Sequence, residues 1–600
     1  MSAPGTGTEG RILSGPPLPP WLASLSGETL DELLDLAVAR SPDAVAIVMR
    51  DGDRLERWTY RELGETSRRV AATLRSHGVG PGARVLTWAA NDPYLVATYF
   101  AAWRLGAAVV PLDLRMAPDV AARIGRAVDA ALLVAGPSVG RQEVEALGLP
   151  VVAVDGASLD PRGPPAPQPV AQQQLAPQPP RGAAAGDGAL AEARAAGPST
   201  LAEIIFTSGT TTDPKGVTLT HAQMIHNVRA VALASRPIRR QHALAVIPLS
   251  HAYGQMILLV GLLTGSQLTF VAGTSPTRIL EALRQDRVDT ITTVPQFLEI
   301  VLARIEGEAA RRGSLERLRR ARSLALALHL PIRVRRWLFR DVLAGLGGAL
   351  RVLGCGGARL PAGLQLAWEA MGVIVVQAYG ATECAAIAGH DRRNRRSGTV
   401  GPPLTGVEVR IAPDGELLAR GPNATAGYWR RPADTAEMLA GGWVHTGDAA
   451  TIDPHGELVI LGRTRDRIAL PNGMKVYPED VEQALTAQAA VRLAAVLEGA
   501  PGQLVAVLIP TGDAVADADL DGAVRAANAS LAPHQRVRRW RRWPDDDFPR
   551  THTLKVRRAQ VEGWLADRAR VEAQAPGETL APGEAASVDD GSGSDDRAPE

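Results

Sequence analysis

The chain has 600 residues, of which 46% are hydrophobic and 22% charged, and its formal net charge is +1. These values are typical of a soluble globular protein with two or more domains, and the near-neutral charge argues against a surface built mainly to bind nucleic acid. Two cysteines, Cys355 and Cys384, are too few for a disulfide framework or a cysteine metal site, so a cytoplasmic location is expected.

The first twenty residues are rich in Gly, Pro and Ser and have no apolar segment of the kind found in secretory signals. We therefore expect residues 1–21 to be a disordered leader. The most apolar run, residues 256–263, is far shorter than the roughly 20 residues that span a bilayer. No transmembrane segment is predicted, and any membrane contact would be peripheral.

Strands and helices alternate from residue 29 onward, which predicts βαβ units and a largely parallel sheet. The hydrophobic periodicity indicates helices at 29–39, 60–77 and about 94–105, and strands at 44–49, 84–88 and 107–112. Residues 157–199 interrupt this pattern with a tract of Pro, Gln, Ala and Gly that has no face to bury, so a surface insertion is expected there.

More αβ units follow at 285–294, 350–355 and 372–378, and a region of short strands occupies 401–461. The fold class expected is α/β, with a large N-terminal domain at 22–462 that combines αβ-layered parallel sheets and a β-rich subdomain. A small, mobile α+β domain is expected at 463–570, and a disordered acidic tail at 571–600.

One stretch, residues 207–216, combines hydroxyls, glycines and a single lysine directly after a strand-like segment at 202–206. Backbone N–H groups, small hydroxyls and an ammonium group are the chemistry that holds a polyphosphate. The stretch is not a Walker A loop, because Lys215 precedes Gly216 and no Gly-Lys-Ser/Thr occurs. Its alternative interpretation is an ordinary Ser/Thr turn. The candidate phosphate-binding residues are Thr207, Ser208, Gly209, Thr210, Thr211 and Lys215.

Eight further motifs follow this loop in a fixed order, and together they resemble the adenylate-forming, AMP-binding superfamily of acyl-CoA synthetases, luciferases and peptide-synthetase adenylation domains. The resemblance covers about residues 25–568 and is greatest to the long-chain fatty acyl-CoA synthetases. The motifs lie at 248–255, 354–358, 377–383, 421–429, 443–448, 462–468, 472–482 and 549–555.

The resemblance implies a role for particular residues. In Thr382-Glu383, the hydroxyl can donate to a phosphate oxygen and the carboxylate suits a hard cation, and the resemblance implies that Glu383, with Thr207, holds Mg²⁺. Without the family context, Glu383 would be a solvated carboxylate, Tyr379 a core residue, His251 a core histidine and Asp448 a turn former. By resemblance, the nucleotide contacts are Thr382 at the phosphate, Tyr379 and Gly380 with Gly356, Gly357 and Ala358 at the base, and Asp448 with Arg463 at the ribose.

The same resemblance places His251 at the acyl pocket and Lys555 at the reacting phosphate, where its charge would offset charge that builds on phosphoryl oxygens. Arg465 matches the hinge about which the small domain rotates between half-reactions. Gly473 matches the loop that lines the pantetheine tunnel. The expected cofactors are ATP, Mg²⁺ and coenzyme A, and the expected acid is a medium- or long-chain fatty acid.

Two positions depart from the common family pattern. Thr212 replaces a glycine in the phosphate loop, and Leu554 replaces the glycine before the catalytic lysine. The alternatives that stay open are a ligase for an aryl or other acid, transfer to a carrier protein, a non-catalytic paralogue that binds nucleotide or fatty acid, and a peptide-synthetase module.

Overall fold

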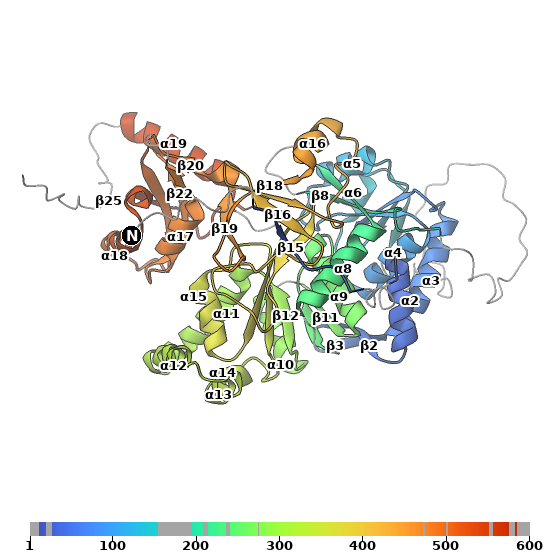
Figure 1. Cartoon of the computed structure of the whole chain (residues 1–600), viewed down its shortest axis with the longest axis horizontal. Helices are drawn as coiled ribbons and strands as arrows, with labels where there is room; N and C mark the ends of the chain where they lie inside the picture. The colour runs from blue at the N-terminus through green and yellow to red at the C-terminus, as the bar shows by residue number, and fades with distance from the viewer. Residues whose placement is uncertain are drawn as a thin grey trace, which may run out of the picture. The chain divides into compact units, whose positions relative to one another are not determined.

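The computed structural model describes residues 11–19, 27–153, 195–207, 214–235, 240–273, 275–471, 474–499, 502–550, 556–574 and 583–584. The chain forms two compact units, one of Met1–Thr446 with Ala450–Ile460 and one of Gly447–Ala449 with Leu461–Glu600 (Figure 1). Outside the described residues lie most of the predicted insertion and six candidate site residues, Ser208, Gly209, Thr210, Thr211, Gly473 and Lys555.

The first unit contains an eight-stranded sheet in the order β15-β14-β13-β12-β10-β11-β2-β3. Its inner strands are parallel, and only the two edge strands are antiparallel to their neighbours. Alternate residues of one strand enter different cores, since Ala243 and Ala245 pack on one face and Leu244 on the other. The strands are β2 (Val45–Asp51), β3 (Arg54–Thr59), β10 (His242–Ala245), β11 (Gln267–Val271), β12 (Thr290–Thr293), β13 (Val352–Cys355), β14 (Ile374–Ala381) and β15 (Ala385–Gly389).

A second sheet of the same unit has six strands in the order β7-β6-β4-β5-β8-β9. All pairs are parallel except β8 with β9, which form an antiparallel hairpin. The segment 217–220 is strand, because Val217 and Leu219 alternate with threonines and bury one face, and it leads directly into a helix that begins at His221. The strands are β4 (Arg84–Trp88), β5 (Ala108–Pro111), β6 (Leu132–Ala135), β7 (Val151–Ala153), β8 (Leu201–Phe206) and β9 (Gly216–Thr220).

Helices pack on both sheets, and the largest core joins α2, α3, α4, α8 and α9 to strands of both. Local signals fix several helix starts: Thr59 and Glu62 form a capping box before α3, and the Asp92 carboxylate caps α4. The helices are α2 (Leu30–Arg40), α3 (Tyr60–Ser76), α4 (Pro93–Arg104), α5 (Pro118–Ala127), α6 (Arg141–Glu145), α8 (His221–Ser235), α9 (Ala252–Thr264), α10 (Pro276–Gln285), α11 (Pro295–Arg311), α12 (Leu315–Ala327), α13 (Ile332–Leu338), α14 (Arg340–Ala344) and α15 (Ala362–Ala370).

A β-rich region follows, with five strands in the order β1-β16-β17-β18-β19. Within the predicted leader, β1 pairs antiparallel with β16, so this part of residues 1–21 is an ordered edge strand. The elements are β1 (Leu13–Ser14), β16 (Glu408–Ile411), β17 (Glu416–Arg420), α16 (Pro432–Met438), the 3₁₀ turn η3 (Ala440–Gly442), β18 (Val444–Ile452) and β19 (Leu458–Arg463).

The second unit is a small α+β structure whose main sheet has the order β22-β23-β24-β25. Its last helix enters the stretch predicted as a tail, and a short strand there pairs with β24. The elements are η4 (Thr464–Asp466), β20 (Ile468–Ala469), β21 (Lys475–Val476), α17 (Pro478–Thr486), β22 (Val491–Glu498), β23 (Leu504–Pro510), α18 (Asp517–Ser530), η5 (Pro533–Gln535), β24 (Val537–Arg542), α19 (Arg558–Gln574) and β25 (Gly583–Glu584).

The observed architecture confirms the predicted fold class, with parallel αβ layers, a β-rich region and a smaller α+β unit. Among the described helices, none has the length and apolar character needed to cross a membrane.

Candidate active site

The phosphate loop closes a β-hairpin. The Thr207 N–H donates to the Lys215 carbonyl at 2.9 Å, and the Thr207 hydroxyl lies 3.4 Å from the same oxygen. The pair thus continues the β8–β9 ladder by one step beyond Phe206 and Gly216. The loop itself, residues 208–213, lies outside the described part of the chain. The residues on either side of it are held together at the same end of the β8–β9 hairpin.

Lys215 lies among side chains from a distant segment. Its Nζ is 2.5 Å from Asp434 Oδ1 on α16 and 5.3 Å from the centre of the Tyr428 ring. The Tyr428 hydroxyl in turn donates to Glu383 Oε1 at 2.8 Å. Two predicted residues, Lys215 and Glu383, are therefore linked through one tyrosine to which the sequence motif assigned no role.

Backbone pairing explains how Tyr428 reaches this position. The Trp429 N–H donates to the Gly216 carbonyl at 2.7 Å, and the Thr218 N–H donates to the Gly427 carbonyl at 3.1 Å. Segment 427–429 thereby lies along β9 directly after the phosphate loop. Burial and the adjacent Glu383 carboxylate raise the pKa of Tyr428, so its hydroxyl remains a hydrogen-bond donor.

Thr382 and Glu383 occupy the tight turn between β14 and β15. A Cβ on Gly380 would lie 1.8 Å from the Ala385 carbonyl oxygen, so only glycine fits there. The Glu383 carbonyl accepts from the Thr425 N–H at 2.7 Å, which fixes its backbone as Tyr428 fixes its side chain. The described residues contain no cluster of three or more His, Cys, Asp or Glu side chains suited to a metal. One carboxylate fits Mg²⁺ only where substrate phosphates supply further oxygens.

Gly356, Gly357 and Ala358 follow β13, and Gly357 has a φ of +79°. The structure places Tyr253 against this turn, because a Cβ on Gly356 would lie 3.2 Å from the Tyr253 ring. The Tyr253 hydroxyl is 3.4 Å from the Thr293 carbonyl, and burial raises its pKa well above its ordinary value. Tyr379, the predicted partner of these glycines, lies at the register shift between β14 and β15, and its role stays a prediction.

His251 is paired with an aspartate that sequence reasoning missed. Its Nε2 lies 3.0 Å from Asp113 Oδ2, and the Asp113 carboxylate also accepts from the backbone and side chain of Arg115. Burial alone would raise the pKa of Asp113, but these hydrogen bonds outweigh it and hold the pKa below its ordinary value. The one signal for Asp113 in the sequence is its place two residues after β5, at the carboxyl end of a parallel strand, where ligand-binding residues often lie.

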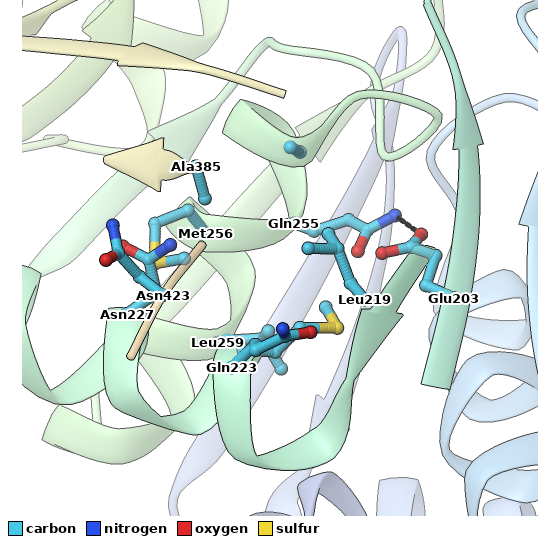
Figure 2. A pocket seen from close by; sticks show the side chains of 11 residues that line it. Glu203, Leu219, Gln223, Asn227, Gln255, Met256, Leu259, Ala385 and Asn423 are labelled. Atoms are coloured by element: carbon cyan, nitrogen blue, oxygen red, sulfur yellow. Dashed lines mark hydrogen bonds between the residues drawn. The ribbon is translucent and has the colours of Figure 1, made fainter. Parts of the chain in front are cut away.

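A small cavity of about 10 Å³ lies between α8, α9 and the hairpin, with room for about one water molecule (Figure 2). Its polar wall includes Glu203 and Gln255, whose side chains hydrogen-bond to each other. Burial raises the pKa of Glu203 to about 8. Among the described residues, Glu203 Oε2 and Gln255 Oε1 are buried without a hydrogen-bond partner. The apolar wall is formed by Leu219, Met224, Ala252, Met256, Leu259 and Ala385.

In the second unit, the two predicted ribose residues form an ion pair. Arg463 Nε lies 3.1 Å from Asp448 Oδ1, and the Asp448 residue is only 7% exposed. The Thr464 hydroxyl donates to the Gly447 carbonyl at 3.1 Å, which ties the two motifs together. Arg465, the predicted hinge, lies in the single turn η4 and is exposed, 3.6 Å from the Asp466 carboxylate.

Comparison with known protein families gives two matches. Residues 34–429 match the AMP-binding enzyme model, and residues 465–568 match the AMP-binding enzyme C-terminal domain. A feruloyl-CoA synthase of Amycolatopsis sp is 31% identical over 80% of this chain and 88% of that protein. The long-chain fatty acid CoA ligase FadD15 of Mycobacterium bovis is 29% identical over 62% of this chain and 68% of that protein.

Solved structures agree on the fold. The amide bond synthetase McbA from Marinactinospora thermotolerans is 27% identical, with a TM-score of 0.68 and coverage of 89% of this chain and 99% of that one. The anthranilate CoA ligase AuaEII, in complex with anthranoyl-AMP, is 19% identical, with a TM-score of 0.71 and coverage of 90% and 98%. The predicted resemblance is confirmed, and the chain belongs to the AMP-binding enzyme family.

Proposed function

We propose that this chain is a cytoplasmic ligase that activates a medium- or long-chain fatty acid with ATP and transfers the acyl group to coenzyme A. ATP, Mg²⁺ and coenzyme A are the cofactors that CoA ligases of this family use, in agreement with the prediction. The observation that carries the proposal is the link from Lys215 through Tyr428 to Glu383, which joins three distant motifs at the end of the phosphate loop.

In the first half-reaction, a carboxylate oxygen of the acid attacks the α-phosphorus of ATP, and the bond to the bridging oxygen breaks to release pyrophosphate. Thr207 and Lys215 are proposed to hold the phosphates, and Thr382 to donate to a phosphate oxygen. Glu383, oriented by the Tyr428 hydroxyl, would hold Mg²⁺. That ion supplies charge neutralisation on the phosphates when bound. Lys555 is proposed to add a positive charge at the reacting phosphate.

In the second half-reaction, the thiolate of coenzyme A attacks the acyl carbon, and AMP leaves with the electron pair of the broken bond. We assign Asp448 and Arg463 to the ribose, Arg465 to the hinge and Gly473 to the pantetheine tunnel, all by resemblance. The ion pair between Asp448 and Arg463 supports the ribose role, since it holds the Asp448 carboxylate in one orientation.

One observation supports a fatty acid as the substrate. FadD15, a relative that matches 62% of this chain, is named a long-chain fatty acid ligase. A second candidate is an aryl acid, because feruloyl-CoA synthase aligns over a larger share of the chain.

The test is acid-dependent pyrophosphate release with ATP and Mg²⁺, measured for C6 to C18 fatty acids, benzoates, ferulate and amino acids, each with and without coenzyme A. Release that rises with chain length, with acyl-CoA formed only when coenzyme A is added, supports the fatty acid ligase. A preference for ferulate or benzoates selects the aryl acid candidate. Release without thioester points to a carrier protein or another acceptor, and no release with any acid overturns the enzymatic function.

A further inference from the structure

A surface of the first unit has an unusual distribution of side chains. The described residues include thirteen large hydrophobic residues that are exposed, and six of them fall between positions 324 and 338, on α12, α13 and the adjoining segment. We call these six the apolar patch: Leu324, Leu328, Ile332, Val334, Trp337 and Leu338.

Exposure within the patch is high. Trp337 is 66% exposed, Leu328 64% and Leu324 58%. Single exposed leucines are ordinary on a protein surface, but six on neighbouring short helices are not, because each hydrophobic side chain left in water forgoes part of the free energy of its burial. The helices α12, α13 and α14 lie together at one margin of the first unit (Figure 1).

The arginines of α13 show that the exposure of its apolar side chains is not simply a consequence of how the helix packs. Arg335 and Arg336 point inward, where their guanidinium groups donate to main-chain carbonyls of Leu330, Glu369 and Leu350 at 2.6–3.1 Å. The apolar side chains of the same helix face the solvent instead. A surface helix usually turns its apolar side chains to the core and its charged ones to water, and α13 largely does the reverse. Such an exposed apolar face is typical of a surface that binds a membrane or a partner protein.

A basic margin adjoins the patch. Between Arg311 and Arg340 the sequence contains ten arginines and one carboxylate, Glu316. Four of these arginines pair with Glu306 or Glu308 at the end of α11, and Arg340 lies 3.7 Å from Asp341, so the basic character of the margin comes mainly from Arg317, Arg320 and Arg333. Arg317, Arg320 and Leu324 follow one another on the same stripe of α12 at spacings of three and four residues, and Leu328 is the residue directly after its last turn. In the described part of the chain, no acidic partner is found for Arg317, Arg320 or Arg333, and Arg340 stacks 5.5 Å from the Trp337 ring.

We propose that the apolar patch with this arginine margin is a docking site for the surface of an anionic lipid bilayer. Apolar side chains and Trp337 would enter the boundary between headgroups and acyl chains, while the arginines pair with lipid phosphates. The proposal goes beyond the proposed function, since it concerns where the enzyme works and holds for any apolar acid.

Charge argues against the main rival occupants. A symmetric contact with a second copy would bring two arginine-rich margins together, which is unfavourable. A nucleic acid would pair with the arginines but leave the six hydrophobic side chains without an apolar partner. A bilayer with anionic headgroups satisfies both halves of the surface.

The test is flotation of the full chain with vesicles of phosphatidylcholine alone and with 30% phosphatidylglycerol. Wild type is expected to bind the anionic vesicles at least tenfold better than the neutral ones. Reversal of three charges (Arg317→Glu, Arg320→Glu, Arg333→Glu) should lower the partition coefficient by at least about a hundredfold, given about fivefold for each basic residue removed and the repulsion added by each glutamate. The double variant Leu328→Ser, Trp337→Ser should also lose most binding at low salt.

Matched controls are Arg525→Glu on α18 and Leu114→Ser, both at exposed positions outside the patch, and they should bind as wild type does. The thermal midpoint of each variant verifies folding. Equal binding to neutral and anionic vesicles, or patch variants that bind like wild type, would overturn the proposal. The proposal would also be overturned if the patch variants changed only self-association, measured by sedimentation, or only RNA binding, and left vesicle binding unchanged.

Discussion

The Lys215 ammonium lies 2.5 Å from the Asp434 carboxylate, so the lysine proposed for the nucleotide phosphates already has an anionic partner within the protein. Both side chains are partly solvated, with exposures of 36% and 26%. Such pairs contribute about 0.2–1 kcal/mol, because water competes for both charges. A triphosphate can therefore displace the carboxylate at modest cost.

Removal of the Asp434 charge should make ATP binding easier. In Asp434→Asn, we expect the KM for ATP to fall about twofold to fivefold. This factor corresponds to the free energy of the part-solvated ion pair that ATP no longer has to break. Steady-state pyrophosphate release at varied ATP measures this change. Glu437→Gln, on the same helix α16, is the control and should leave the KM within about twofold. A higher KM in Asp434→Asn would instead assign Asp434 to positioning Lys215.

Lys555 carries the sharpest prediction from the resemblance. In Lys555→Ala, adenylation should slow by on the order of 10²–10³, by analogy with the loss of one preorganised charge-stabilising group. Thioester formation from added acyl-adenylate should change far less, because the resemblance implies that the small domain rotates about Arg465 before that step. Single-turnover measurements of the two steps separate these effects. The neighbouring Arg557→Ala is the control, and similar losses in both steps for Lys555→Ala would contradict the assigned role.

The sequence predicted the elements whose signals are local. Helix α3 and strand β4 lie where periodicity placed them, since a capping box and a buried strand are written in adjacent residues. The hairpin strand β9 was missed although its apolar residues alternate, because a helix follows it directly. The order of β1 also depends on a distant segment, since only pairing with β16 holds it.

Within the site, the sequence identified motif residues and missed those that arrive from elsewhere in the fold. Lys215 and Glu383 were named separately, but their link requires Tyr428, which reaches Glu383 only because segment 427–429 pairs with β9. Asp113 has no motif around it, and its contact with His251 depends on the order of parallel strands. Such contacts are set by topology, which no short stretch of sequence contains.

Asp113 should act as a positioning residue for His251. In Asp113→Asn, we expect kcat/KM for the acid to fall about tenfold, since one charge-assisted hydrogen bond is lost. His251→Ala should cost a similar factor, and the double variant should be no worse than either single one. The control is Asp119→Asn, an exposed residue of α5. Losses that multiply in the double variant would show that the two residues act independently.

The stability of wild type relative to Asp113→Asn should depend on pH. The folded pKa of Asp113 lies below its unfolded value of about 3.9, so its carboxylate stabilises the fold above that pH. This contribution is lost as the pH falls from about 4 toward the lower folded pKa. The stability difference between wild type and Asp113→Asn should therefore be constant above pH 5 and shrink in more acidic buffer, as measured by urea unfolding.

Glu203 should give the opposite pH dependence. Burial raises its folded pKa to about 8, above an unfolded value near 4.3, so folding keeps the proton on this carboxyl. Stability from this group is complete below about pH 4 and declines as the pH rises toward 8, because the unfolded chain ionises freely there. The loss at pH 8 should be on the order of 1–4 kcal/mol.

The isosteric Glu203→Gln should remove that decline, since an amide keeps a hydrogen bond to Gln255 and has no charge to bury. Thermal midpoints of the variant and wild type should agree within a few degrees at pH 5 and diverge at pH 8.5, with the variant higher. Glu32→Gln, a carboxylate of α2 that is not deeply buried, is the control and should follow wild type at both pH values. If Glu203→Gln and wild type fall in parallel from pH 5 to 8.5, Glu203 is already ionised in the folded chain, and the pairing with Gln255 holds it as a carboxylate.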